Sequence, residues 1–179
     1  IMHINKYVIN NIKTFINIKM NSLKYRKIKI IIYSIFIILI DQTSKFLVLT
    51  ILGFEKSKNI IPNLLNLYLV KNKGAAFSLF SNSTIILTII SILASLLLVI
   101  VILKYPLRTY WQSIGLSYLL AGTVGNGIDR LFKGYVLDFL ELVPINFPIF
   151  NIADISINLA IICFIINFLK TKDNSKIKY

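Results

Sequence analysis

Four aspartates lie within or at the edge of long apolar segments, where a charged side chain is costly: Asp41, Asp129, Asp138 and Asp154. An ionisable side chain at the centre of a bilayer costs about 2.5–3.5 kcal/mol on insertion scales, so such residues indicate a function that needs them. Two neighbouring carboxyl groups cannot both ionise cheaply, and they share one proton. Such a pair can take a proton from water with one member and polarise a carbonyl group with the other.

Other catalytic chemistries have few candidate residues. A single histidine lies near the N-terminus and the single cysteine is Cys163, so Ser–His and Cys–His pairs, the HExxH zinc pattern and an internal disulfide are excluded. We assign Cys163 to packing and expect no metal and no other cofactor. A Ser–Lys pair stays open, as Ser44 with Lys45 or Ser78 with Lys73. The first of these is poorly placed, because adjacent residues on a helix point about 100° apart.

Four apolar stretches position the aspartates in a chain of 179 residues with a mean hydropathy of +0.76. They comprise residues 30–51, 84–103, 110–128 and 149–169. Each stretch is about 20 residues long, which matches a hydrocarbon core of ~30 Å. Because a backbone in lipid must satisfy its own hydrogen bonds, we predict four transmembrane helices.

The net charge of +13 is distributed unevenly along the chain. Thirteen of the 20 Lys and Arg residues fall in segments 1–29, 104–109 and 170–179, and six in the longer segments 51–83 and 129–148. The positive-inside rule therefore predicts that both termini are cytoplasmic. Attraction to anionic membrane lipid accounts for this basicity, so we expect no nucleic-acid partner.

This topology brings all four aspartates to one level, near the outer face of the membrane. Asp41 lies in the outer half of the first helix, four residues before Lys45, with which it can form an ion pair. Asp129 lies at the outer end of the third helix and Asp138 in the loop that follows. Asp154 lies about one turn into the fourth helix. The sequence therefore predicts a polar site at the outer ends of three helices.

Neighbouring residues favour the same site. Asn126 and Asp129 are three residues apart, as are Asn151 and Asp154, so each pair shares one face of its helix. Small residues give the third helix a thin face that allows close packing. They are Gly122, Gly125 and Gly127.

The two outer loops are predicted to contain structure. Residues 64–70 are rich in strand formers and residues 71–74 have turn chemistry, which predicts a small strand or hairpin over the outer surface. Segment 129–148 is expected to form a short interfacial element with aromatic side chains at headgroup level.

We therefore predict an all-α membrane protein of one domain. Four transmembrane helices carry a small β-containing outer cradle between the first and second helices, and an interfacial lid element between the third and fourth. The helical domain occupies residues 28–170. A basic cytoplasmic extension, 1–27, precedes it, and a basic cytoplasmic tail, 171–179, follows it.

Five short motifs, in order along the chain, resemble those of bacterial lipoprotein signal peptidase, also called signal peptidase II. They are residues 41–45 (DQTSK), 72–77 (NKGAAF), 125–130 (GNGIDR), 136–139 (VLDF) and 150–154 (FNIAD). Each motif alone is weakly specific, whereas all five in this order on four apolar stretches are highly specific.

The resemblance implies an aspartic endopeptidase of the bacterial cytoplasmic (inner) membrane. Such an enzyme removes the signal peptide from diacylglyceryl-modified prolipoproteins on the amino side of the lipidated cysteine. Asp138 and Asp154 would be the catalytic pair, and the helix dipole predicts that Asp154 is ionised while Asp138 holds the proton. Substrate-binding and supporting residues would be Asp41, Lys45, Asn72, Gly74, Asn126, Asp129, Arg130 and Asn151. The expected partners are lipid-modified prolipoproteins and membrane lipid, and we expect a monomer.

Two other functions remain open on the residues alone. Intramembrane carboxylates also mark ion pathways, so a small transporter or proton-relay protein is one alternative. A non-enzymatic assembly factor that holds a helix in an outer groove is another. Asp129 and Arg130 could be a structural charge pair at a helix end or could position substrate.

Overall fold

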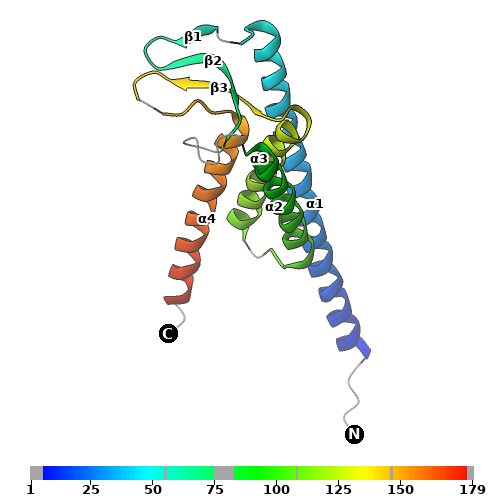
Figure 1. Ribbon diagram of the computed structural model, residues 1–179. Helices are drawn as coiled ribbons and strands as arrows, with labels where there is room; N and C mark the ends of the chain where they lie inside the picture. The colour runs from blue at the N-terminus through cyan, green and yellow to red at the C-terminus, as the bar shows by residue number, and fades with distance from the viewer. Residues whose placement is uncertain (1–5, 55, 75–82, 108, 146, 177–179) are drawn as a thin grey trace.

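The computed structural model describes the backbone of residues 6–54, 56–74, 83–107, 109–145 and 147–176, and side chains from residue 24 to residue 172 within these ranges. The protein is mostly helical, with a small sheet at one end of the helices (Figure 1). The helices are α1 (Lys6–Ile51), α2 (Thr84–Lys104), α3 (Tyr110–Lys133) and α4 (Ile152–Lys176). The strands are β1 (Ser57–Ile61), β2 (Leu65–Asn72) and β3 (Val136–Leu142).

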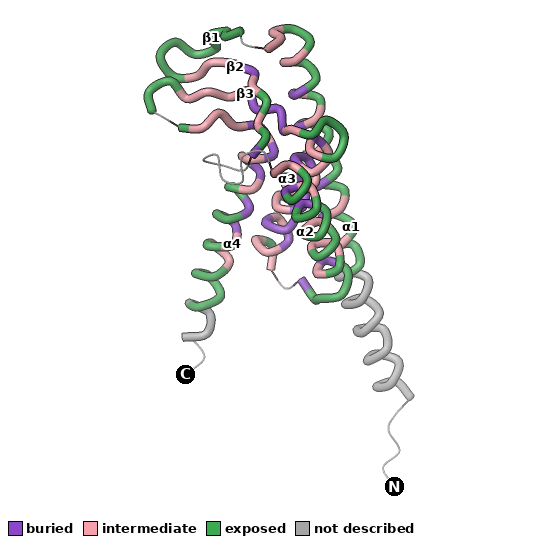
Figure 2. Tube along the Cα trace, in the orientation of Figure 1, coloured by how far each residue is buried: buried purple, intermediate pink, exposed green. Residues whose placement is uncertain are grey.

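Three helices are long and apolar enough to cross a membrane: Lys24–Ile51 of α1, Thr84–Lys104, which is the whole of α2, and Ile152–Lys172 of α4. They correspond to the first, second and fourth apolar stretches of the sequence. Many of their large apolar side chains are exposed, which is the pattern of a surface that faces lipid (Figure 2). Three of the four predicted spans are therefore found by length and composition.

The third predicted span, α3, is not among these three apolar segments, and it extends to Lys133 rather than ending at Ile128. It packs against α1, α2 and α4 and is the helix most enclosed by protein (Figure 2). Its buried positions include many small or polar residues. They are Ser113, Gly115, Ser117, Ala121, Gly122, Gly125, Asn126 and Asp129. A helix that faces other helices needs little apolar surface, and this explains the lower hydropathy of α3.

Glycines let the neighbouring helices approach α3 closely, as predicted. A Cβ atom on Gly122 would lie 2.5 Å from the carbonyl oxygen of Ala153 in α4. A Cβ atom on Gly125 would lie 2.8 Å from Oδ2 of Asp41 in α1. Gly127 faces α2, with 3.2 Å between its added Cβ and the nearest side-chain atom. Each glycine therefore serves a different neighbour.

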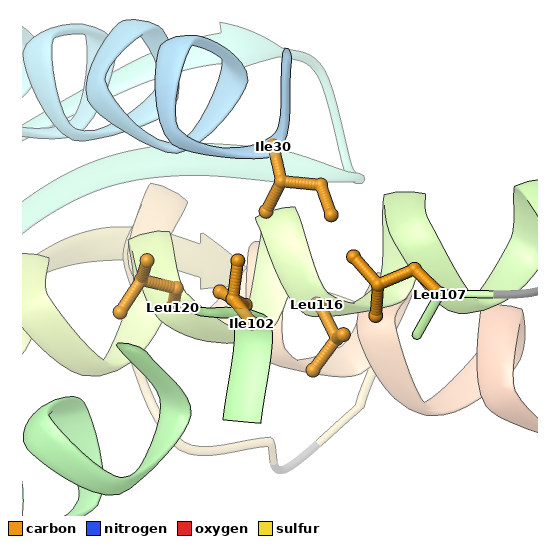
Figure 3. Close-up of a cluster of buried hydrophobic side chains, with 5 residues drawn as sticks. All are labelled: Ile30, Ile102, Leu107, Leu116 and Leu120. Carbon is orange, nitrogen blue, oxygen red and sulfur yellow. The ribbon is translucent and has the colours of Figure 1, made fainter. Parts of the chain in front are cut away.

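An apolar cluster joins α1, α2 and α3 at the end away from the sheet (Figure 3). Its buried members are Ile30, Ile102, Leu107, Leu116 and Leu120.

The sheet is antiparallel, with the strand order β1-β2-β3. The predicted strand at residues 64–70 is confirmed as β2. The segment expected to form a separate interfacial element instead contains β3, which pairs with β2 so that Asn72 lies opposite Val136. The cradle is thus built from both outer loops, because strand pairing between distant segments leaves no local signal in the sequence. Leu69, Leu137 and Phe139 form a small core that holds the sheet to α1 and α4.

We predict that Gly122→Ala lowers thermal stability, whereas Gly127→Ala is close to neutral. Both variants gain the same helix propensity, so their difference reports the clash of the new methyl group with the backbone of Ala153. Overpacking of this kind costs about 1–3 kcal/mol. Thermal unfolding of the purified proteins in detergent measures the difference in stability between the two variants. Equal unfolding midpoints would contradict the packing described.

Candidate active site

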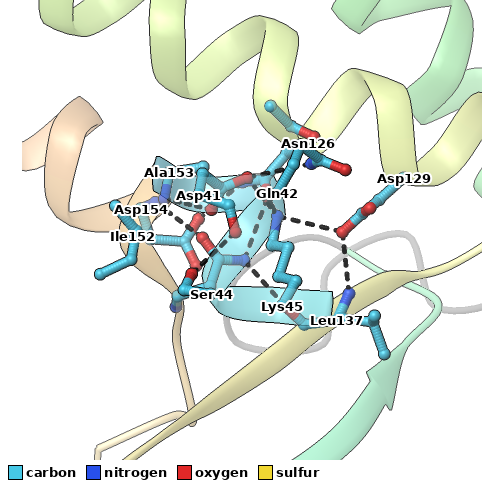
Figure 4. Close-up of polar contacts among 12 residues, drawn as sticks. Asp41, Gln42, Ser44, Lys45, Asn126, Asp129, Leu137, Ile152, Ala153 and Asp154 are labelled. Atoms are coloured by element: carbon cyan, nitrogen blue, oxygen red, sulfur yellow. Dashed lines mark hydrogen bonds and ion pairs between the residues drawn. The ribbon is translucent and has the colours of Figure 1, made fainter. Parts of the chain in front are cut away.

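A fully buried lysine lies at the centre of a charged cluster between α1 and α3 (Figure 4). The ammonium group of Lys45 is 2.8 Å from Oδ2 of Asp41 and 3.0 Å from Oδ2 of Asp129. It also donates to Oδ1 of Asn126 at 3.2 Å. Three acceptors therefore satisfy the three N–H groups of one ammonium ion. The predicted Asp41–Lys45 pair is confirmed, and Asp129 is an additional partner.

The two aspartates of this cluster also hold backbone N–H groups. Oδ1 of Asp41 accepts a hydrogen bond of 2.9 Å from the amide of Ala153, in the first turn of α4. Oδ2 of Asp129 accepts one of 3.2 Å from the amide of Leu137 in β3. Each contacted amide belongs to the residue directly before one of the two predicted catalytic aspartates. The charged cluster therefore positions both of them.

Asp154 lies in a reciprocal cap at the start of α4. Oδ1 of Asn151 accepts from the amide of Asp154 at 3.0 Å, and Oδ2 of Asp154 accepts from the amide of Asn151 at 3.1 Å. This is the pattern of a capping box, which satisfies two N–H groups at a helix start. The other carboxylate oxygen of Asp154 accepts from the side chain of Asn126 at 2.8 Å. Asn126 and Asn151, each predicted to lie near an aspartate three residues later, therefore both belong to the network around Asp154.

Asp138 is held by the sheet and by α4. Its Oδ2 accepts from Nδ2 of Asn72 at 2.8 Å, and its Oδ1 accepts from Nδ2 of Asn151 at 2.6 Å. Asn72 lies opposite Val136, two residues before Asp138, so the side chains of Asn72 and Asp138 are diagonal neighbours on one face of the sheet. The pairing of β2 with β3 therefore creates this contact.

The two acids share one network and one cavity. Nδ2 of Asn151 also donates to Oδ1 of Asn126 at 3.0 Å, so Asn151 and Asn126 connect Asp138 with Asp154. Both carboxyl groups line a cavity of about 780 Å³. Its walls are largely apolar and come from the sheet, α2, α3, α4 and the segment before α4. They include Val70, Ile90, Ala94, Val136, Ile149 and Ile157.

Arg130 also lines the cavity but does not pair with Asp129 in the way the sequence suggested. The carboxylate of Asp129 binds Lys45 and, at 2.7 Å, Lys133. The guanidinium group of Arg130 donates to the carbonyl oxygen of Gly74 at 3.3 Å, and its buried Nε has no hydrogen-bond partner among the described residues. Adjacent residues on a helix point in different directions, which separates the two side chains.

The charges around the cavity balance when the pair of acids holds a single proton. The site holds four carboxyl groups, because Asp138 and Asp154 lie near Asp41 and Asp129. Three positively charged side chains interact with these four groups. The cations are Lys45, Lys133 and Arg130. One proton on Asp138 or Asp154 therefore makes the cluster neutral.

Burial raises the pKa of Asp138 from 3.8 to about 6, and the negative charge of Asp154 acts in the same direction. Hydrogen bonds from Asn72 and Asn151 oppose this rise, as does the charge of Lys45. Loss of water around the carboxylate is the larger effect, because few charges compensate it directly. The direction is the one that lets Asp138 hold a proton.

A Ser–Lys pair finds no support in the described residues. The hydroxyl group of Ser44 donates to the carbonyl oxygen of Asp41 at 2.7 Å, and Lys45 is fully engaged by its three acceptors. Ser78 lies outside the described residues. Among the residues that the structure describes, no group of three or more His, Cys, Asp and Glu side chains could hold a metal ion.

Two supporting residues were not anticipated. Gln42 donates to Oδ2 of Asp41 and to the carbonyl oxygen of Gly125, both at 3.1 Å, and so joins α1 to α3. Lys133 was detectable, because it follows Asp129 by four residues on one helix. Gln42 belongs to the motif at residues 41–45, but its contact with α3 could not be predicted, because a contact across two helices has no local spacing.

A buried carboxyl group and a half-buried one on the same cavity, beside helices long enough to cross a membrane, define a membrane-associated enzyme of the acid–base class. The family profile described as signal peptidase (SPase) II matches residues 33–170. This match covers well over half of the chain, and the chain belongs to the signal peptidase II family and is a peptidase.

Similar proteins agree with this assignment. The lipoprotein signal peptidase of Parasynechococcus marenigrum is 44% identical over 78% of this chain and 88% of its own length. That of Streptococcus agalactiae is 39% identical over 83% of this chain and 97% of its own length. A solved bacterial membrane enzyme superposes with a TM-score of 0.77 at 34% identity, over 84% of this chain and 93% of its own. These findings favour a peptidase over a transporter or an assembly factor.

We predict that the Asp138 carboxyl group makes the folded protein less stable as pH rises from 3.8 to about 6. In this window the folded state still binds the proton that the unfolded chain has released, so stability falls with increasing pH and levels off above it. Unfolding midpoints of the wild type and Asp138→Asn, measured across this range, give the contribution by difference. A difference that is constant with pH, or one that grows in the wild type's favour as pH rises, would contradict the raised pKa.

Proposed function

We propose that this chain is a membrane-embedded aspartic endopeptidase that uses Asp138 and Asp154 as its catalytic pair. Its substrates are diacylglyceryl-modified prolipoproteins, cleaved on the amino side of the lipidated cysteine. The observation that carries the proposal is the single hydrogen-bonded network that holds both acids on one cavity. Membership in the signal peptidase II family supports the substrate class.

The reaction is a general acid–base hydrolysis. The ionised carboxylate of Asp154 takes a proton from a water molecule, whose oxygen attacks the carbonyl carbon of the scissile peptide bond. The protonated carboxyl group of Asp138 donates its hydrogen to the carbonyl oxygen as negative charge develops there. When the carbon–nitrogen bond breaks, Asp154 gives the proton that it took from water to the leaving amine. The hydroxyl group formed on the former carbonyl oxygen returns its proton to Asp138 as the carbonyl group forms again, so the pair holds a single proton as before.

The surrounding side chains hold this pair in one orientation. Asn72 and Asn151 fix the carboxyl group of Asp138, while Asn126 and the cap of α4 fix that of Asp154. Arg130 and the Gly74 carbonyl oxygen that it binds lie at the edge of the same site and are proposed to contact the substrate backbone. The ion pairs of Lys45 with Asp41 and Asp129 hold the backbone next to both acids.

The proposed substrate also explains the composition of the cavity. Its apolar walls on α2 and α4, including Ile90 and Ile157, suit the acyl chains of a diacylglyceryl group. Phe147 lines the cavity and packs edge-on against Phe150, with 5.6 Å between ring centroids. We assign the segment around these two rings to a lid over the bound peptide.

We further propose that α3 crosses the membrane with α1, α2 and α4, so that both termini are cytoplasmic and the sheet lies at the outer face of the bacterial inner membrane. The excess of Lys and Arg in the terminal segments and in the α2–α3 connection supports this orientation. Residues 28–170 form the peptidase domain, between the basic extension 1–27 and the basic tail 171–179.

We predict that Asp138→Asn and Asp154→Asn each abolish cleavage, because neither amide can serve as the acid or base that the reaction requires. Each purified variant is incubated with a lipid-modified precursor, and the two cleavage fragments are quantified by electrophoresis. Glu141→Gln is the matched control, since Glu141 lies on β3 but binds Asn66 instead of the catalytic network. Near-normal processing by either aspartate variant would refute the assignment of the pair.

We also predict that a strong chelator leaves the rate of cleavage unchanged, because the proposed mechanism polarises the carbonyl group with a proton instead of a metal ion. The test is a comparison of initial rates with and without a chelator in excess over trace divalent ions. A loss of activity that added metal restores would require a different mechanism.

A further inference from the structure

A second cavity, of about 440 Å³, lies between α1 and α3, away from the active site. Two basic residues, Arg26 and Lys29, line it together with three tyrosines: Tyr25, Tyr33 and Tyr110. Tyr33 is the lining tyrosine of α1 nearest to the active site. It lies eight residues before Asp41, which corresponds to about 12 Å of helix. The catalytic network therefore uses none of these residues.

No acidic side chain among the described residues balances the positive charge of this cavity. No Asp or Glu is among its lining residues. Lys29 is exposed and makes no hydrogen bond or ion pair with another described residue. Arg26 donates from Nη1 to the carbonyl oxygen of Leu107 at 2.6 Å, which fixes its guanidinium group between α1 and the α2–α3 connection. A carbonyl oxygen carries no full charge, so both cations remain available to an anion.

The cavity is also apolar in part and lies where lipid headgroups are expected. Ile30 and Ile114 contribute its apolar lining, and Tyr33 is half exposed beside them. The lining residues of α1 fall in the first turns of the apolar helix segment Lys24–Ile51. Tyrosines at that level are typical of a membrane interface, and basic pockets between helices at the cytoplasmic end bind anionic lipid headgroups.

We propose that this cavity binds the headgroup of an anionic phospholipid. Arg26 and Lys29 pair with the phosphate group, and hydroxyl groups of the tyrosines donate hydrogen bonds to its oxygens. The acyl chains follow the exposed apolar side chains of α1 that begin here, such as Ile32 and Phe36. An apolar surface that continues from the basic residues favours a lipid over a free phosphate ion. The bound lipid would join α1 to α3 at the end opposite the sheet.

The test measures lipid binding to the full-length protein in detergent by native mass spectrometry and by thermal unfolding. Phosphatidylglycerol is compared with phosphatidylcholine for the wild type, Lys29→Gln and Arg26→Gln/Lys29→Gln. Lys104→Gln is the matched control, because it removes the same charge at the same end of the helices without lining the cavity.

We expect the wild type and the control to retain phosphatidylglycerol in preference to phosphatidylcholine and to be stabilised by it. The double variant should bind phosphatidylglycerol at least tenfold more weakly, with Lys29→Gln in between. If the double variant does not fold, Lys29→Gln alone decides, since Lys29 is exposed and has no partner among the described residues whose loss could unfold the protein.

Three results would overturn the proposal. An equal loss of binding in Lys104→Gln would show only general surface attraction. Equal retention of phosphatidylcholine would show an apolar groove without headgroup recognition. Stabilisation by inorganic phosphate to the same extent, removed by the same substitutions, would show a site for a free anion.

Discussion

The buried ammonium group of Lys45 is the interaction on which the rest of the structure depends. A charge without water is tolerated only when it is paired, and removing one partner of such a pair typically costs about 3–5 kcal/mol. Asp41 and Asp129 supply the partners from α1 and α3, and their other contacts reach the backbones of Ala153 and Leu137. One cation thus holds two helices together and sets the start of α4 and the position of β3. These are the two elements that carry the proposed catalytic pair.

This arrangement sorts four similar carboxyl groups into two kinds. Asp41 and Asp129 each form an ion pair with a lysine, and each also binds a backbone amide of another element. Asp138 and Asp154 receive hydrogen bonds from amides, with no cation within ion-pairing distance among the described residues. Neutral donors leave these two acids free to exchange a proton, as the proposed hydrolysis requires. The two kinds differ because the ion pairs of Lys45 with Asp41 and Asp129 do not line the cavity, whereas Asp138 and Asp154 do.

Local sequence patterns were sufficient for the parts of the fold that depend on local physics. Apolar runs of bilayer length predicted α1, α2 and α4, and the i, i+4 spacing predicted the pair of Asp41 with Lys45. The prediction that four aspartates meet at one level needed only helix order and charge counting. Contacts across elements were less accessible. The bond of Asn72 to Asp138 depends on the pairing of β2 with β3, and the bond of Lys45 to Asp129 depends on how α1 rotates against α3.

The position of Asn151 limits how the chain could escape an inhibitor. Its side chain donates to Asp138 and Asn126 while it accepts from the backbone at the start of α4. Aspartate would lose the donors, serine would be too short to reach both partners, and glutamine would displace the cap. If Asp138 acts as proposed, an inhibitor that binds the side-chain amide of Asn151 would therefore select few resistant substitutions at this position, because each would also disturb the contact with Asp138.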